Sequence, residues 1–548
     1  MENILAVNSS DHSAWRRVAV SPRANGSGGR VVQDPQTDSW LAVAGTWFHG
    51  GGFASGEEER LLAEYLAGGA ERLARDLEGF FLLLIGDGRL HELIVITDLM
   101  GSRHGFVREL EQCAIVSTSL LPLVDLAPAT PDPRGCREFL RWGSAFEDRT
   151  LFREVRKLSP ATIYRFKDGA CREKRSYWSM ADLDPFRYRD RRAVEELGAA
   201  MIDAARRIGR VFPRPICDLT GGYDSRAVVT AFLAAGVDFS TTVSGPPDSP
   251  DVRVARSLSP LIRKSHWPID DRFQLSFDEV RQALSRTGGL YDAVDYARID
   301  RIHRPLAQRF DAGINGSYGE LARGYWWESW RKGLDFRRLA RRRFVPERGA
   351  SLWLRGEGEW FEELVEMLER VDAPLRDAPA TMRIDHLYLQ LRMQRWQGSI
   401  ASATDQRWPC LSPFMFRSVL ETILQTEASL RARSLLARRM MAGLQPDLAA
   451  VPLTNGAPAL PLTPRTARLF LPLIETYLLK VLRPPTPAPA RLLDEEPWRE
   501  FLKPREMRVG ELIDSTRWQS FLTEARFTPP WNRLLTLELA LRWPSPLA

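Results

Sequence analysis

The residues best suited to chemistry in this sequence form one short turn, T-G-G-Y-D-S, at positions 220–225. Its two adjacent glycines have no Cβ atom, so the backbone can approach a ligand closely, and the first N–H groups of a following helix would point at that ligand. The hydroxyls of Thr220 and Ser225 can donate hydrogen bonds to phosphate oxygens, and Asp224 can hold the divalent ion that accompanies a nucleotide. The turn therefore predicts a phosphate site, although an ordinary glycine turn between a strand and a helix would have the same residues.

For this chemistry the turn must lie between a strand and a helix. Residues 216–219 are mainly apolar, are opened by Pro215 and are closed by the first glycine, a pattern typical of a buried parallel strand. After Ser225, small and apolar residues recur at helical spacing as far as Gly236, which is a C-terminal signal. The sequence therefore predicts a strand that feeds a helix through the glycine turn.

A second strand and helix follow. Residues 239–243 are expected to form another parallel strand, and Ser249-Pro250-Asp251 is expected to begin the next helix. Strands that alternate with helices indicate a doubly wound α/β sheet, whose ligand lies at the carboxyl ends of the strands. Val243 and Ser244 lie at such an end, and we expect them to frame an adenine base.

The first part of the chain predicts a layered α+β domain. Residues 41–45 suggest a strand, residues 57–73 a helix, and residues 80–85 and 93–97 a hairpin. A second strand pair is expected to turn at Asp168-Gly169.

The two predicted domains meet near residue 190. The charged stretch 182–192 is typical of a linker, and an amphipathic helix is expected over 194–208. We expect one domain over residues 1–185 and a second over residues 190–548.

The composition is that of a globular protein. Hydrophobic residues make up 44% and charged residues 27%, and 76 basic residues face 70 acidic ones. The mixed charges do not indicate nucleic-acid binding, and the arginine-rich stretch 337–343 is typical of a solvated helix face. Five well-separated cysteines suggest neither a disulfide framework nor a zinc site, and no apolar run has the length of a membrane span. We expect a cytoplasmic protein.

The turn and its flanks resemble a known family. Residues 220–225 are similar to the S-G-G-x-D-S pyrophosphate loop of ATP pyrophosphatases, and the flanking chain resembles the asparagine synthetases. In that family the loop holds the pyrophosphate that leaves when ATP adenylates a carboxylate. The resemblance implies that ATP and Mg²⁺ are cofactors, and that the nucleotide-binding residues are Leu219, Thr220, Gly221, Gly222, Tyr223, Asp224, Ser225, Val243, Ser244, Asn315 and Gly316.

The first domain resembles the N-terminal nucleophile glutamine amidotransferases of the same family. Residues 57–62, 77–80, 97–102 and 117–120 follow that domain's order and spacing. Those enzymes use a cysteine as residue one, whereas this chain begins Met1-Glu2-Asn3, has no cysteine before Cys113, and has Ala44-Gly45 in place of the family's Asn-Gly pair. We expect a structural remnant without glutaminase activity.

The second domain departs from the family at its acidic residues. The segment I-N-G-S-Y-G-E-L-A-R-G-Y at 314–325 corresponds to S-G-E-G-x-D-E-L-F-x-G-Y, with Gly319 at the metal-binding aspartate. Only Asp224 and Glu320 are left as expected ligands of Mg²⁺, with a catalytic position for Glu320. Alternatively, Glu320 caps the following helix and pairs with Arg323.

Two further positions bear on catalysis. Arg407 lies in D-Q-R-W-P-C-L-S, similar to the family's E-x-R-x-P-F-L-D, where a guanidinium could bind a phosphate or a carboxylate; an ion pair with Asp405 or another residue is the alternative. By its spacing from Gly456, Thr454 replaces the family's charged lysine. Loss of such a group reduces the rate on the order of a hundred- to a thousandfold.

The leading hypothesis is an asparagine synthetase-like ligase. It would adenylate a small-molecule or peptide carboxylate with ATP and pass it to an amine, without hydrolysing glutamine. Intramolecular lactam or macrolactam closure is one form of this reaction. The alternative is a degenerate relative that binds ATP or acts as a regulatory protein. The sequence favours no particular oligomeric state.

Overall fold

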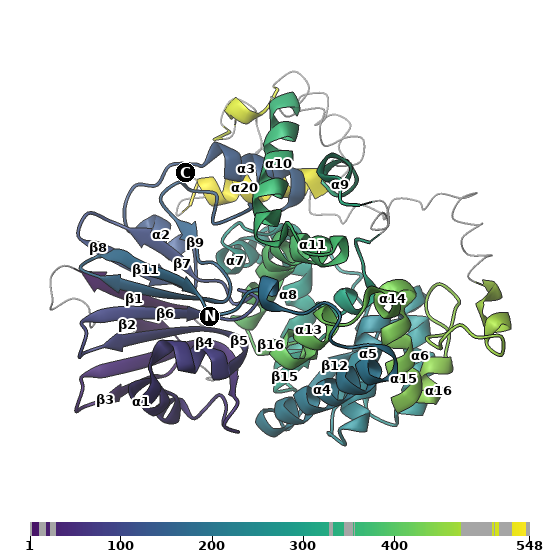
Figure 1. Ribbon diagram of the computed structural model, residues 1–548. Coiled ribbons are helices and arrows are strands. Elements are labelled where there is room, and N and C mark those ends of the chain that lie inside the picture. Colours follow the sequence, from purple (N-terminus) through teal and green to yellow (C-terminus); the bar gives the residue numbers. More distant parts are fainter. Residues whose placement is uncertain are drawn as a thin grey trace.

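The computed structural model describes residues 3–9, 18–21, 29–327, 333–344, 355, 357–472, 507–508, 510–514 and 529–543. These residues form two antiparallel sheets, built from the early part of the chain, and one parallel sheet. In Figure 1 the antiparallel sheets lie on one side of the molecule and the parallel sheet with its helices lies on the other. The proline-rich stretch 484–489 is outside the described residues.

The two antiparallel sheets have five and six strands. The first has the order β2-β1-β8-β7-β9, with β1 (Asn3–Ser9), β2 (Val18–Ser21), β7 (Phe106–Glu109), β8 (Cys113–Ser117) and β9 (Arg156–Lys157). The second has the order β11-β10-β6-β5-β4-β3, with β3 (Val31–Asp34), β4 (Ser39–His49), β5 (Leu77–Asp87), β6 (Glu92–Thr97), β10 (Thr162–Lys167) and β11 (Ala170–Ser176). The expected hairpin is confirmed as β5–β6, and the strand pair that turns at Asp168-Gly169 is confirmed as β10–β11.

Strand β4 explains the layering. Its side chains alternate, so Leu41 and Val43 pack with α1 (Glu58–Asp76), whereas Ala42 and Ala44 pack with residues of β1 in the other sheet. Both faces of β4 are therefore buried, which accounts for its almost continuous apolar sequence. The outer face of the first sheet shares a core with α3 (Pro133–Trp142) and α20 (Pro529–Leu541).

The third sheet is parallel throughout, in the order β14-β13-β12-β15-β16. Its strands are β12 (Pro215–Asp218), β13 (Ser240–Ser244), β14 (His266–Ile269), β15 (Ala312–Ile314) and β16 (Cys410–Leu411). The central strand β12 is covered on both faces. Cys217 belongs to the core shared with α4 (Asp190–Val211) and α5 (Tyr223–Ala234), and Ile216 packs with Leu306 of α8 (Ala293–Ala307) and Trp408.

In Figure 1 most of the remaining helices surround the parallel sheet and the top of the molecule, and α2 lies beside the antiparallel sheets. They are α2 (Leu121–Asp125), α6 (Pro250–Ile262), α7 (Phe277–Thr287), α9 (Phe336–Arg343), α10 (Glu357–Asp372), α11 (Ala380–Leu387), the π-helix Tyr388–Gln397, α12 (Gly398–Asp405), α13 (Arg417–Leu424), α14 (Ala428–Arg431), α15 (Leu435–Leu444) and α16 (Pro446–Ala450). No helix among the described residues is long and apolar enough to span a membrane.

Two sequence-based expectations concern charged helices. The arginine-rich stretch is confirmed as helix α9, and its Arg337 forms an exposed ion pair with Glu362. The expected linker was wrong at its end, because α4 already begins at Asp190. Arg191 and Arg192 each pair with the glutamate four residues later, and such pairs stabilise the exposed, charged start of the helix.

Close packing between β4 and β5 yields a test of the fold. Gly45 has φ +98°, and a Cβ atom there would lie 2.1 Å from the carbonyl oxygen of Phe80. We expect Gly45→Ala to destabilise the protein by at least about 3 kcal/mol. Gly443 in α15 has open space around it, so Gly443→Ala should be neutral or stabilise by up to about 1 kcal/mol. Urea unfolding of both variants measures the difference, and equal stabilities would contradict the assigned packing.

Candidate functional site

The 220–225 turn follows β12 directly and leads into α5, as the sequence predicts. The helix begins at Tyr223 with Gly222 as its N-cap, two residues earlier than the sequence pattern suggests. Asp224 and Ser225 therefore lie in the first helical turn, where backbone N–H groups lack intrahelical partners and favour negative charge.

The hydroxyl groups of the turn form hydrogen bonds within the turn. The backbone N–H of Thr220 donates to Ser225 Oγ at 3.1 Å, and the two hydroxyl oxygens lie 2.8 Å apart. The N–H of Gly222 donates to Thr220 Oγ1 at 3.2 Å. Leu219 is fully buried and its N–H donates to the Thr242 carbonyl, so this residue holds the strand in the sheet.

The two glycines have different surroundings. The N–H of Gly221 donates to the carboxylate of Asp251 at 2.8 Å, and its carbonyl accepts from the N–H of Thr454 at 3.2 Å. A Cβ atom on Gly221 would lie 2.3 Å from the Thr454 methyl group, whereas one on Gly222 would meet only Thr220 Oγ1, at 3.4 Å. The turn is therefore open at Gly222 and covered at Gly221.

Asp224 is neutralised by an arginine. Nε and Nη2 of Arg323 donate to the two carboxylate oxygens at 2.9 and 2.7 Å. Burial raises the pKa of Asp224, and the guanidinium opposes that rise. The expected pairing of Arg323 with Glu320 was wrong, because Arg323 lies against Asp224 instead. One carboxylate oxygen of Glu320 is buried without a hydrogen-bond partner, and burial together with nearby Asp224 raises the pKa of Glu320.

The segment after β15 covers the turn through its glycines. A Cβ atom on Gly316 would lie 2.7 Å from the backbone N of Ser225, and one on Gly319 would lie 2.8 Å from Cβ and Cγ of Asp224. The side-chain oxygen of Asn315 accepts from the N–H of Ser317 at 3.0 Å, and its Nδ2 donates to Sγ of Cys410 at 3.5 Å. Both glycine positions thus lie directly on Asp224 and Ser225, where larger side chains would not fit.

The predicted ligands do not form a site that fits Mg²⁺ in this arrangement. Both oxygens of Asp224 are engaged by Arg323, and Gly319 packs against the same carboxylate. Throughout the part of the chain that the structure describes, no group of three or more His, Cys, Asp or Glu residues is placed to hold a metal ion. A magnesium ion at Asp224 and Glu320 would require Arg323 to move away.

Val243 and Ser244 border a small cavity beside the turn. Its volume is about 140 Å³, and it is lined by Asp218, Thr220, Thr242, Val243, Ser244, Arg298, Ile299, Ile302, His303 and Leu306. Burial raises the pKa of Asp218 to about 7 and lowers the pKa of His303 to about 4. The indole N–H of Trp408 donates to Nδ1 of His303 at 3.1 Å, which is consistent with a neutral imidazole. The cavity shares Thr220 with the 220–225 turn.

Arg407 lies in an ion-pair network around Asp300. Its Nε and Nη2 donate to Asp300 of α8 at 2.6 and 2.7 Å, and Asp300 also accepts from Arg286 and Arg304. Asp405 pairs with Arg103 instead, at 3.3 Å. The structure thus gives Arg407 the alternative role, an ion pair with another residue, and its catalytic role remains a prediction.

Sequence reasoning missed several residues that contact the turn. Asp251 was recognised only as part of a helix start, Asp218 only as part of the strand, and Arg323 only as a partner for Glu320. Arg438 of α15 donates to the hydroxyl of Tyr223 from more than two hundred positions further along the chain. In the sequence, only the charge of these side chains could have suggested a role at the turn, because the residues that they contact are distant in sequence.

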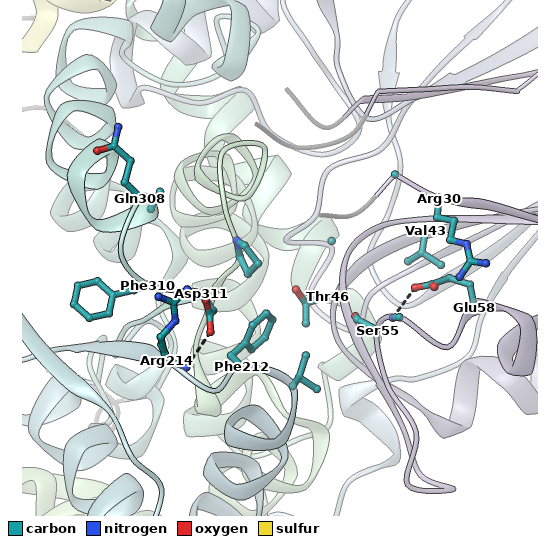
Figure 2. Close-up of a pocket in the computed structure, with 16 residues that line it drawn as sticks. Arg30, Val43, Thr46, Ser55, Glu58, Phe212, Arg214, Gln308, Phe310 and Asp311 are labelled. Atoms are coloured by element: carbon teal, nitrogen blue, oxygen red, sulfur yellow. Dashed lines mark hydrogen bonds and ion pairs between the residues drawn. The ribbon is translucent and has the colours of Figure 1, made fainter. Parts of the chain in front are cut away.

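A second, larger cavity lies between β4 and the parallel sheet. Its volume is about 670 Å³, and Figure 2 shows Thr46, Ser55 and Glu58 on one wall and Phe212, Arg214 and Asp311 on the other. Arg214 and Asp311, which lie on the same wall, form an ion pair at 2.8 Å. Met1 and Glu2 lie outside the described residues, so the expected lack of glutaminase activity stays a prediction.

Comparisons with known proteins give one informative match. Residues 50–178, less than half of the chain, match the family described as a glutamine amidotransferase domain. This supports the amidotransferase-like assignment of those residues. No curated protein matches the sequence.

Three solved structures are similar in part. One is described as the allosteric regulatory enzyme of purine biosynthesis, with 9% identity, 49% of this chain and 73% of that chain covered, and a TM-score of 0.20. Glutamine phosphoribosylpyrophosphate amidotransferase from B. subtilis has 11% identity, 49% and 59% coverage, and a TM-score of 0.20. NMN synthetase from Francisella tularensis has 15% identity, 36% and 94% coverage, and a TM-score of 0.20. At such TM-scores, no conclusion about this chain rests on them.

The buried carboxyl of Asp218 predicts a pH dependence of stability. Its pKa is about 7 in the folded protein and 3.8 ordinarily, so the folded state binds a proton between these values that the unfolded chain releases. The stability from this group is complete below pH 3.8 and is lost as the pH rises to about 7. Asp218→Asn removes the buried charge that opposes folding at higher pH.

We therefore expect Asp218→Asn to raise the melting temperature on the order of 2 °C at alkaline pH, with a smaller rise in mildly acidic buffer and no change below pH 3.8. Thermal unfolding across this pH range measures the effect. The exposed Asp203, whose side chain is 62% accessible, provides a control substitution to Asn that should show no such pH dependence. A uniform loss of stability in Asp218→Asn would contradict the assigned protonation.

Proposed function

We propose that this chain is an ATP-dependent carbon–nitrogen ligase similar to the asparagine synthetases. ATP binds with its phosphates at the 220–225 turn and its base in the cavity beside Val243 and Ser244, and a carboxylate is adenylated with release of pyrophosphate. The observation that carries this proposal is the position of the turn. It leaves the carboxyl end of the central parallel strand, opens at Gly222, and shares Thr220 with the neighbouring cavity.

The chemistry of the turn supports a phosphate ligand. The space beside Gly222 is open, and the first backbone N–H groups of α5 point toward that space. Arg323 and Arg438 bring positive charge to Asp224 and Tyr223 at the start of this helix. Together these groups favour an anion with several oxygens.

In the proposed function, the first part of the chain has a structural role and does not hydrolyse glutamine. Residues 50–178 match a glutamine amidotransferase domain, yet no cysteine occurs before Cys113. We propose that residues 1–185 and 190–548 are two domains of a cytoplasmic enzyme, and that the amine comes from ammonia or from the substrate. The carboxylate belongs to a small molecule or a peptide, which includes internal lactam formation.

Two specific observations favour a second function. The neutral Thr454 lies directly against Gly221, where the resemblance places a charged lysine, and Asp224 is occupied by Arg323. A chain that binds ATP for regulation, without turnover, would tolerate both features. Detection of AMP formation separates the two functions.

Gly222 provides the test of nucleotide binding. Since a Cβ atom there meets no protein atom closer than 3.4 Å, Gly222→Val should fold normally, but its methyl groups would occupy the space of the phosphate oxygens. We expect it to weaken ATP binding on the order of a hundredfold, measured by calorimetry. Gly443→Ala serves as the control, because that glycine is exposed and far from the turn in sequence. Unchanged affinity in Gly222→Val would make the turn purely structural.

The proposed reaction predicts its products. Incubation with ATP, carboxylic acids and ammonium or amines should yield AMP and pyrophosphate, because the turn would hold pyrophosphate as the leaving group. Replacing ammonium by glutamine should release no glutamate above background, since the amidotransferase nucleophile is missing. Chromatography of the nucleotides and a glutamate assay measure both. ADP in place of AMP, or steady glutamate release, would contradict the proposal.

A further inference from the structure

One cation lies at the point where a nucleotide's metal ion would have to bind. Arg323 donates from Nε and Nη2 to both oxygens of Asp224, at 2.9 and 2.7 Å. This bidentate pairing leaves the Nη1 hydrogens for another acceptor. The side chains of Arg323 and Asp224 are only 21% and 19% exposed, so the pair sits half-buried at the mouth of the turn.

The surroundings hold Arg323 in this position. Its guanidinium lies 5.6 Å from the ring centroid of Tyr223 and 5.9 Å from that of Tyr325. Both distances are within the range of cation–π attraction. Tyr223 is in turn fixed by a hydrogen bond from Arg438. Arg323 is thus positioned by a carboxylate and two aromatic rings, and its geometry is set before any ligand arrives.

The same surroundings leave no room for a metal-binding carboxylate. A Cβ atom at Gly319 would be 2.8 Å from Cγ and 2.9 Å from Oδ1 of Asp224, so any side chain there would collide with the existing pair. The glycine allows the backbone to pack against Asp224 and brings Arg323, four residues later, to its oxygens. The glycine at position 319 and the ion pair between Arg323 and Asp224 therefore depend on each other.

We propose that Arg323 replaces the divalent ion at this site, so that the phosphates of a nucleotide, or free pyrophosphate, bind at the 220–225 turn without metal. This inference rests on the proposed nucleotide binding. Arginine suits the role because its planar guanidinium is always charged and binds phosphate oxygens through paired N–H groups. Asp224 then acts as a positioning residue that orients Arg323, and it does not ligate a metal.

Calorimetric titration with ATP and with pyrophosphate tests this, in EDTA and in excess MgCl₂. For the native chain we expect affinities in the two buffers to agree within about threefold. Asp224→Asn should bind ATP in EDTA severalfold more tightly, because it removes a negative charge near the phosphates and keeps the guanidinium. The opposite is expected of a metal ligand, whose loss would weaken binding in MgCl₂.

A double variant isolates the guanidinium. Asp224→Asn with Arg323→Gln removes both charges and so leaves no unpaired buried carboxylate, and it is compared with Asp224→Asn alone. We expect it to bind ATP on the order of ten- to a hundredfold more weakly in EDTA. Arg323→Lys should keep part of the affinity, because its charge is retained. The control is Arg337→Gln, an α9 arginine that is 52% exposed and paired with Glu362 of α10.

The outcomes are distinguishable. Metal-independent binding that is lost in the double variant supports the inference. Binding that appears only with MgCl₂ and survives Arg323→Gln overturns it while leaving the proposed nucleotide site intact. Absence of ATP and pyrophosphate binding in both buffers, by a protein whose melting temperature is normal, overturns the proposed function and this inference together.

Discussion

The ion pair of Asp224 and Arg323 is the interaction on which the candidate site depends. A carboxylate in the first turn of α5 gains from the free N–H groups there, but its partial burial requires a cation. Arg323 can reach it only because Gly316 and Gly319 let the chain after β15 lie directly on Asp224 and Ser225. The glycines, the arginine and the acid therefore form one unit, and a change at one of them alters the electrostatics of the whole turn.

This unit is joined to the antiparallel sheets through the loop after β6. Buried Asp98 accepts from the N–H groups of Met100, Ser102 and Arg103 and so shapes the loop after β6. From that loop, the hydroxyl of Ser102 contacts that of Tyr318, next to Gly319, and Arg103 forms a fully buried ion pair with Asp405. Removing one member of a buried pair costs about 3–5 kcal/mol, so the two halves are energetically linked.

The chemistry that remains possible follows from these constraints. A turn that supplies N–H groups, hydroxyls and a fixed guanidinium can bind and orient phosphates, and positioning is a large part of what phosphoryl and adenylyl transfer need. The neutral Thr454 beside Gly221 removes one charge that the resembling family uses later, in amide formation. In the proposed reaction, ATP binding and adenylation would depend on different residues from transfer to the amine, so separate measurements of ATP affinity and product formation are informative.

The sequence by itself determined the elements and the turn, because these depend on neighbouring residues. Apolar periodicity located β12, the β5–β6 hairpin and α1, and the glycine pair located the turn before α5. It also showed that no cysteine precedes Cys113 in the given sequence. Only the tertiary structure decided the partners: Arg323 for Asp224, Asp251 for Gly221, and Asp300 for Arg407. These pairs join residues separated by 99, 30 and 107 positions, and no local pattern specifies which charge will meet which across a folded sheet.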